Sequence, residues 1–295
     1  MEISRKVQIR LNVFFATTAV LFIVVLAMYE LGYLDELLTI LAKDNYIFYW
    51  MMLVGFLAEI VAGSMGMGYG VICTTTLLFL NIPPHVVSAS IHSAESFTTA
   101  AGSISHVKLK NVSKGLVKKL AIPAVAGAII GAVCLTYLGE YYAKITKTII
   151  AFYTLYLGFQ ILSNAFKKKQ DKKLKRKTNL TRLGLIGGFI DSFAGGGWGP
   201  LVTGTLIKNA FTPRFAVGSS TVAKFILTLT AAITFIFTLG IQHWNIILGL
   251  LIGGIVTAPF SAMLTARLPV KKMFLIIGTL VIVMSSITIY KSVFN

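Results

Sequence analysis

The sequence contains little charge of either sign. Only 13% of its 295 residues are Asp, Glu, Lys or Arg, about half the share found in an average soluble domain. Because 56% of the residues are hydrophobic, most of the surface cannot face water, which excludes an ordinary soluble enzyme. Sparse charge with a high apolar content also excludes an intrinsically disordered chain. The composition therefore indicates a polytopic membrane protein.

Cysteine is scarce, and the motifs of common hydrolases and metal sites are absent. Cys73 and Cys134 lie apart in apolar segments, so we expect neither a disulfide framework nor a metal site. The sequence contains no HExxH, no GxSxG and no cluster of His and carboxylates at metal-ligand spacing. We therefore expect no metal, no cofactor and no catalytic residue. A pairing of Asp191 with His92 keeps an intramembrane enzyme open as an alternative.

The charges that are present are unevenly distributed. If the N-terminus is cytoplasmic and every apolar segment crosses the membrane, 22 of the 27 basic residues fall on the inner side. The outer side holds only Lys43, Lys144, Lys147 and Lys291. This asymmetry predicts a multi-pass cell-membrane protein with a cytoplasmic N-terminus and an outer C-terminus, and argues against a nucleic-acid partner. We expect the basic run Lys167–Arg182 to be cytoplasmic and to contact anionic lipid headgroups.

Apolar segments follow one another along the whole chain. We expect membrane segments at 12–31, 46–63, 69–81, 86–105, 116–138, 146–166, 182–195, 198–209, 215–240, 244–266 and 271–292. Four of these segments are short for a complete span. They form two pairs, 46–63 with 69–81 and 182–195 with 198–209, and glycines interrupt each pair.

The two interrupted pairs begin an internal repeat. Glu59 corresponds to Asp191 at an offset of 132, and Gly68-Tyr69-Gly70 corresponds to Gly197-Trp198-Gly199 at an offset of 129. Five crossings separate the two units, so they have opposite orientations. The sequence thus predicts an all-α membrane protein with two inverted repeats, each a broken-helix hairpin plus three transmembrane helices. The expected divisions are an N-terminal part with one extra helix (1–45), repeat 1 (46–166), a basic linker (167–181) and repeat 2 (182–295).

These motifs resemble the sulfite exporter TauE/SafE family, also called the toluene sulfonate uptake permease family. The likeness rests on two broken-helix motifs, Ala62-Gly63 followed by Gly68-Tyr69-Gly70 in the first copy and AGGGWGP at 194–200 in the second. The sequence GSST at 218–221 and the small-residue segment 253–266 also fit. The resemblance covers about 46–293 and implies transport of small anions, chiefly sulfur oxyanions, organosulfonates and related carboxylates. Val71 stands where the family pattern has a proline, so the first copy departs from that pattern.

The glycine breaks are the first candidate for substrate binding. Glycine permits tight turns and close approach of a ligand to the backbone, and a helix that begins after a break directs free N–H groups toward it. Two such helix ends that converge at mid-membrane can hold an anion. The alternative is that the glycines only permit close helix packing. The candidate residues are Gly66, Gly68, Gly70, Gly195, Gly196, Gly197, Trp198 and Gly199.

Ionisable residues inside the apolar segments are the second candidate. A charge at the membrane centre costs about 2.5–3.5 kcal/mol on insertion scales, so such residues usually pair or serve a pathway. Glu95 corresponds to Lys224 in the repeat, and we expect Lys224 to meet the substrate and Glu95 to pair with it in the empty site. A purely structural salt bridge is the alternative. Glu59, Asp191 and His92 are candidates for proton coupling, and Ser219 and Ser220 are candidate donors to the anion.

These features predict a secondary transporter of a small anion that works by alternating access, with proton coupling as an open possibility. An anion channel or facilitator is the nearest alternative, and an intramembrane enzyme is a more distant one. A membrane scaffold would need neither paired breaks nor a buried Lys–Glu couple.

Overall fold

The computed structural model describes residues 30, 39, 46–65, 67–166, 178–209, 211–240, 243–264 and 270–294. It divides into two units, Met1–Phe48 and Tyr49–Asn295, and the following account concerns the second. Gly66, the linker residues 167–177 and, apart from residue 30, the expected helix 12–31 lie outside the described residues. Every regular element in the described part is helical, as the sequence predicts.

The structure describes five helices in the first half of the chain from residue 46 onward. They are α3 (Ile47–Met65), α4 (Tyr69–Phe79), α5 (Pro84–Lys108), α6 (Lys114–Tyr141) and α7 (Ala143–Asn164). Gly68 precedes α4 with a φ of 114°, a conformation that glycine adopts without strain. Pro84 begins α5, where its fixed φ favours a first helical turn and its missing N–H costs no hydrogen bond.

The second half repeats this order. Its elements are α8 (Leu180–Ala194), the π-helical turn η1 (Gly199–Thr203), α9 (Gly204–Lys208), α10 (Pro213–Leu239), α11 (Trp244–Leu264) and α12 (Val270–Phe294). The Asn179 side chain caps α8 by accepting the Arg182 N–H at 3.1 Å. Gly195 ends α8 in the left-handed conformation. The expected segment 198–209 thus begins as a π-helical turn rather than a regular α-helix.

Four helices are long and apolar enough to cross a membrane. They are Lys114–Tyr141, Ala143–Asn164, Pro213–Leu239 and Lys271–Phe294 among the residues described. Shorter apolar helices at Ile47–Ala62, Tyr69–Phe79 and Trp244–Thr257 accompany them. Helix α5 has 25 residues but is not among these spans. Serine, threonine, His92 and Glu95 lower its hydropathy. Several of these polar residues belong to the candidate site described below.

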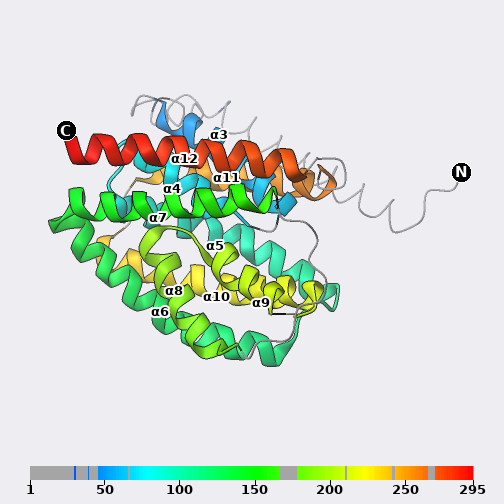
Figure 1. Cartoon of the computed structure of the whole chain (residues 1–295). Coiled ribbons are helices and arrows are strands. Elements are labelled where there is room, and N and C mark those ends of the chain that lie inside the picture. The colour runs from blue at the N-terminus through cyan, green and yellow to red at the C-terminus, as the bar shows by residue number, and fades with distance from the viewer. Residues whose placement is uncertain are drawn as a thin grey trace, which may run out of the picture. The chain divides into compact units, whose positions relative to one another are not determined.

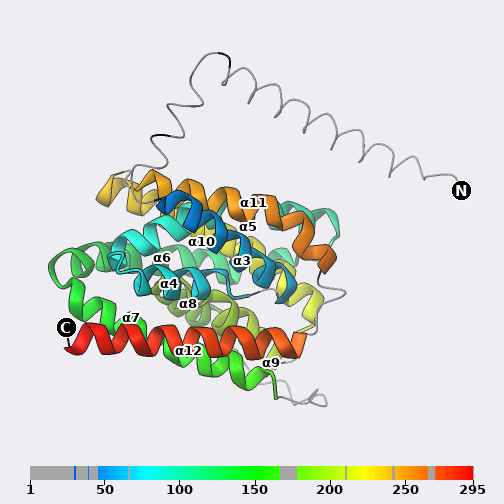
Figure 2. The same ribbon diagram turned by 90° about the horizontal axis from the view of Figure 1, so that it is seen from above.

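Helices from the two halves pack closely against each other. Helix α7 lies beside α12 in both Figure 1 and Figure 2, and α6 packs along α8. At the α6–α8 contact, a Cβ added to Gly188 would lie 2.8 Å from the Cα of Ala124. A Cβ added to Gly127 would lie 2.8 Å from the backbone nitrogen of Phe189. Small residues therefore bring these two backbones together, as is common between membrane helices.

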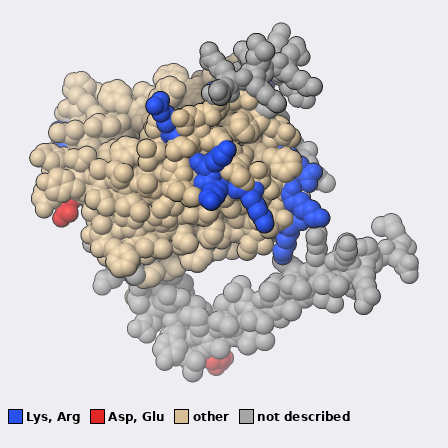
Figure 3. All heavy atoms as spheres, turned by 90° about the horizontal axis from the view of Figure 1, so that it is seen from below, with Lys and Arg blue, Asp and Glu red and all other residues tan. Residues whose placement is uncertain are grey.

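Charge gathers toward one end of the described surface. In Figure 3, most of the lysine and arginine side chains on the visible face lie at one end, and uncharged surface covers most of the rest. A run of basic residues connects α5 to α6: Lys108 ends α5, Lys110 follows it, and Lys114, Lys118 and Lys119 lie at the start of α6. The helices between the two ends carry large exposed apolar side chains such as Ile130, Phe152 and Ile276. An apolar girdle of this kind suits a protein surrounded by lipid.

Candidate functional site

The two glycine breaks meet inside the bundle. A Cβ added to Gly70 would lie 2.6 Å from the Gly195 carbonyl oxygen and 2.8 Å from the Gly196 Cα. The Thr74 hydroxyl of α4 donates a 3.0 Å hydrogen bond to the same Gly195 carbonyl. Backbone from the first break therefore touches backbone from the second, and side chains at Gly70 or Gly196 would separate them.

The second break is closed by its own side chains. The Asp191 carboxylate accepts the Trp198 backbone N–H at 2.7 Å, so the first amide after the break is occupied rather than free for a ligand. The Trp198 indole is 1% exposed and donates to the Ser220 hydroxyl at 2.8 Å. Thr203 shares a further 2.6 Å hydrogen bond with that hydroxyl. The residues 195–200 are all buried.

His92 connects α5 to this closed break. Its Nε2 lies 3.5 Å from the Asp191 carboxylate, and both side chains are fully buried. The other ring nitrogen lies 2.9 Å from the Ser88 carbonyl oxygen. Ser88 in turn donates a 2.6 Å hydrogen bond to the Ser192 carbonyl in the last turn of α8. The Asp191–His92 pair named by the sequence analysis is thus in contact, and it holds the break rather than lining a cavity.

We expect the Asp191→Ala substitution to destabilise the protein by about 3 kcal/mol or more. It leaves the Trp198 N–H and His92 buried without their partner, and removing one member of a buried pair commonly costs about 3–5 kcal/mol. Asp191→Asn keeps an acceptor for Trp198 and should cost clearly less. Thermal unfolding in detergent measures both values. Equal melting temperatures for the two variants would contradict the capping role of Asp191.

Glu95 and Lys224 form the second buried cluster. The Lys224 ammonium donates to the Glu95 carboxylate across the α5–α10 contact. The Lys224 side chain is 17% exposed and the Glu95 side chain 3%. The second Glu95 oxygen is buried and has no hydrogen-bond partner among the residues that the structure describes. The contact that the repeat correspondence predicts between these residues is therefore present.

A cavity of about 480 Å³ opens at this ion pair. Lys224 and Glu95 line it together with Glu59 of α3 and Gly68 of the first break. Four other candidates, Gly195, Gly196, Gly197 and Gly199, are not among its lining residues. In this conformation the open space is at the first break, although the second has the more regular glycine motif.

Ser219 and Ser220 lie elsewhere than expected. Ser219 accepts the Ser113 N–H at 2.9 Å and so caps the start of α6, whereas Ser220 is bound to Trp198. Neither side chain lines the cavity, because their face of α10 turns toward α6 and the second break.

Other polar residues on α5 line the cavity and were not singled out from sequence. Thr98, Thr99 and His106 follow Glu95 at helical spacing and, with Gly102, form one face of α5. Thr99 also shares a 3.2 Å hydrogen bond with Thr228 of α10. The periodicity of three to four residues from Glu95 was the signal that could have identified this face.

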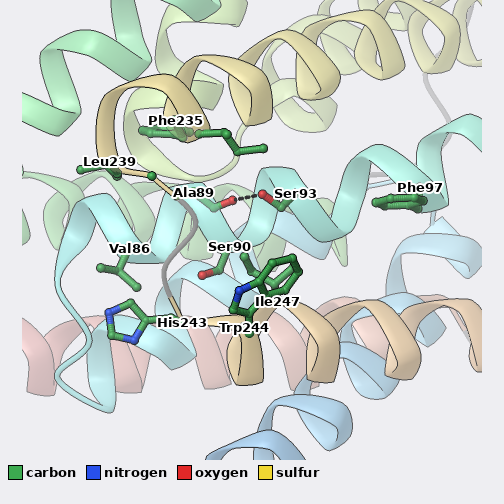
Figure 4. Close-up of a pocket in the computed structure, with 12 residues that line it drawn as sticks. Val86, Ala89, Ser90, Ser93, Phe97, Phe235, Leu239, His243, Trp244 and Ile247 are labelled. Atoms are coloured by element: carbon green, nitrogen blue, oxygen red, sulfur yellow. Dashed lines mark hydrogen bonds between the residues drawn. The ribbon is translucent and has the colours of Figure 1, made fainter.

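A second, smaller cavity lies along the other half of the same helix pair. It measures about 220 Å³ and is mainly apolar. Figure 4 shows Ser90 and Ser93 of α5 between Phe235 of α10 and Trp244 of α11, with His243 at one side. The two cavities therefore flank the middle of α5 from opposite ends. Among the described residues, no group of three or more His, Cys, Asp or Glu could hold a metal ion.

Comparison with known proteins places these features in a family. Residues 51–287 match the family model described as "Sulfite exporter TauE/SafE". The chain is 36% identical over 245 residues to the "Probable membrane transporter protein YtnM" of Bacillus subtilis, a match that covers 80% of each chain. A "Probable membrane transporter protein" of Haemophilus influenzae is 27% identical over 241 residues, or 75% of this chain and 89% of the relative. No solved structure matches the chain.

Proposed function

Since the chain belongs to the sulfite exporter TauE/SafE family, we propose that it carries a small anion, a sulfur oxyanion or organosulfonate, across the cell membrane by alternating access. The carrying observation is the Lys224–Glu95 pair at the cavity beside the first glycine break. Membership of a transporter family implies a function other than catalysis. The chain is a multi-pass membrane protein with four candidate spans in its described part.

The charge balance of the cavity supports coupling to protons. Lys224 is the one lysine or arginine among the lining residues, and two carboxylates, Glu59 and Glu95, accompany it. An anion that reaches Lys224 must replace Glu95 as its partner. Protonation of Glu95 removes the competing charge, so that a proton and an anion enter the site together. The proposal therefore assigns Lys224 to the substrate and Glu95 to the proton.

Helix packing supports two inverted repeats. A Cβ added to Gly55 of α3 would lie 2.9 Å from the Leu250 Cα of α11, and one added to Gly253 would lie 2.7 Å from the Phe56 nitrogen. Gly188 of α8 and Gly127 of α6 make the same pattern of close backbone contacts between α8 and α6. The first helix of each proposed repeat thus packs on a later helix of the other: α3 packs on α11, and α8 packs on α6. Such reciprocal contacts are expected of two units related by a twofold axis, and in inverted-repeat transporters the site lies between the units.

The proposed orientation places the basic end of the molecule in the cytoplasm. The Lys224 cavity then opens inward, and the smaller cavity of Figure 4 lies toward the outer side. Rocking of the repeats about α5 and α10 would close one cavity as the other opens. The closed second break, held by Asp191 and Trp198, is the counterpart of the open first break. The run Lys167–Arg182 would lie at the inner surface, against anionic headgroups.

Flux measurement in proteoliposomes tests the proposed function. Purified protein should catalyse saturable uptake of labelled sulfite or of a small sulfonate, faster when the lumen is alkaline relative to the bath. Preloading with unlabelled anion should accelerate uptake by exchange, which a channel would not show. Absence of flux for sulfite, thiosulfate, sulfoacetate and taurine would overturn the substrate class. Non-saturating flux without exchange would favour the channel alternative.

A further inference from the structure

A separate cavity of about 660 Å³ lies at the end of the molecule opposite the basic cluster of α6. Three segments that are distant in the sequence line it. They are the connection Phe79–Pro84 after α4, the start of α7 and the last turns of α12. Figures 1 and 2 both show the beginning of α7 beside the end of α12.

Three lysines converge on this cavity. Lys144 and Lys147 belong to the first turns of α7, and Lys291 belongs to α12. Lys147 donates to the Asn81 side-chain oxygen, and the Lys291 ammonium lies 4.9 Å from the centre of the Phe79 ring. The two ion pairs found in the described part of the chain involve neither these lysines nor any residue that lines the cavity.

Hydroxyl groups form hydrogen bonds between α7 and α12, the two helices that carry the lysines. Thr148 and Ser292 share a 2.5 Å hydrogen bond between α7 and α12. Ser292 also lies 3.2 Å from the Lys144 carbonyl oxygen, to which it donates. The α7–α12 contact thus holds together the two helices that carry the three lysines. Phe79, Leu80 and Ile82 add apolar surface to the same cavity.

The scarcity of basic residues on this side makes the cluster informative. The proposed topology leaves only four basic residues outside, and three of them line this one cavity. The positive-inside bias explains why outer basic residues are few. It does not explain why residues separated by more than a hundred positions share one cavity without a carboxylate in its lining. An anionic ligand would supply the negative charge that this lining lacks.

We propose that this cavity binds an oxyanion group of the sulfite, sulfonate or phosphate type, through Lys144, Lys147 and Lys291. The assignment to the outer side rests on the proposed function and its topology, whereas the binding itself does not. The apolar surface of Phe79, Leu80 and Ile82 would accept the organic part of the ligand. The oxyanion belongs either to a free anion that approaches the transporter or to the headgroup of an anionic lipid.

The test is equilibrium binding to protein in nanodiscs, which requires no transport. We expect the triple variant Lys144→Gln/Lys147→Gln/Lys291→Gln to bind labelled sulfite or inorganic phosphate at least tenfold more weakly at one class of sites. Lys114→Gln/Lys118→Gln/Lys119→Gln removes three exposed lysines from the opposite end and serves as the matched control. The double variant Lys224→Met/Glu95→Gln removes only the central site. The loss of binding in the triple variant is therefore expected even if the proposed function is wrong.

Lipid composition separates the two sources of the oxyanion. If the ligand is a free anion, the triple variant loses binding in nanodiscs of phosphatidylcholine alone. If it is a lipid headgroup, binding of free anions is unchanged, but the rise in melting temperature caused by phosphatidylglycerol is lost in the triple variant and kept in the control. Wild-type behaviour of the triple variant in both measurements would overturn the proposal.

Discussion

Replacing Lys224 by methionine together with Glu95 by glutamine is expected to lower anion flux by about two orders of magnitude. A hydrogen bond to a charged group contributes about 1.5–3 kcal/mol, and about 1.4 kcal/mol corresponds to a tenfold change in binding. The double variant removes both members of the pair, so neither partner of this ion pair is left buried alone. Initial rates in proteoliposomes, corrected for the amount of folded protein, measure the effect.

Three single variants serve as controls for this prediction. Lys224→Met leaves Glu95 buried without its partner, and we expect a loss of stability of about 3–5 kcal/mol in addition to the loss of flux. Lys224→Arg keeps the positive charge and should retain part of the flux. Glu95→Gln leaves Lys224 charged, so anion binding should persist while its dependence on pH weakens. Wild-type flux in the double variant would show that the pair is only structural.

The Gly70→Ala substitution is expected to reduce both stability and transport. Its Cβ would lie 2.6 Å from the Gly195 carbonyl oxygen and 2.8 Å from the Gly196 Cα. Both are backbone atoms, so neither can move away as a flexible side chain could. Insertion of extra atoms into a packed interior typically costs about 1–3 kcal/mol. The two breaks must separate to admit the methyl group. We therefore expect a lower flux per folded molecule as well as a lower melting temperature.

Gly115→Ala is the matched control for this substitution. A Cβ added to Gly115 would meet nothing within 4 Å, and the residue lies within α6. Alanine is favoured over glycine in a helix by about 1 kcal/mol, so this variant should unfold at the same or a higher temperature and transport normally. If Gly70→Ala unfolds no earlier than Gly115→Ala, the close contact of the breaks is not required.

The sequence predicts those features of the site that occur at corresponding positions of the two repeats. Glu95 and Lys224 occupy corresponding positions, and their contact follows when residues near a twofold axis approach their own counterparts. The helical breaks at Gly68 and Gly195 are also predictable from sequence, because backbone with a positive φ strongly favours glycine. The inverted orientation of the repeats remains a prediction that rests on charge distribution and reciprocal packing.

The sequence does not predict which break faces open space. The second break has the more regular motif, yet Asp191 binds the Trp198 N–H and Trp198 fills the space around it. Under the proposed alternating access, the two copies of the motif would occupy opposite states, and which copy is closed would depend on the conformation. The prediction that Ser219 faces the substrate has a related weakness. Its closeness to Lys224 along α10 does not determine whether its hydroxyl faces the cavity or the Ser113 N–H.

The most direct test of the account is to locate a bound anion. Anomalous scattering from crystals soaked in selenite, the selenium counterpart of sulfite, would mark its position without reference to transport rates. We predict a selenium peak in the cavity beside the first break, with a selenite oxygen within hydrogen-bonding distance of the Lys224 ammonium and with Glu95 turned away. A cavity that contains no selenium, with Lys224 and Glu95 still paired at saturating selenite, would contradict the proposed mechanism.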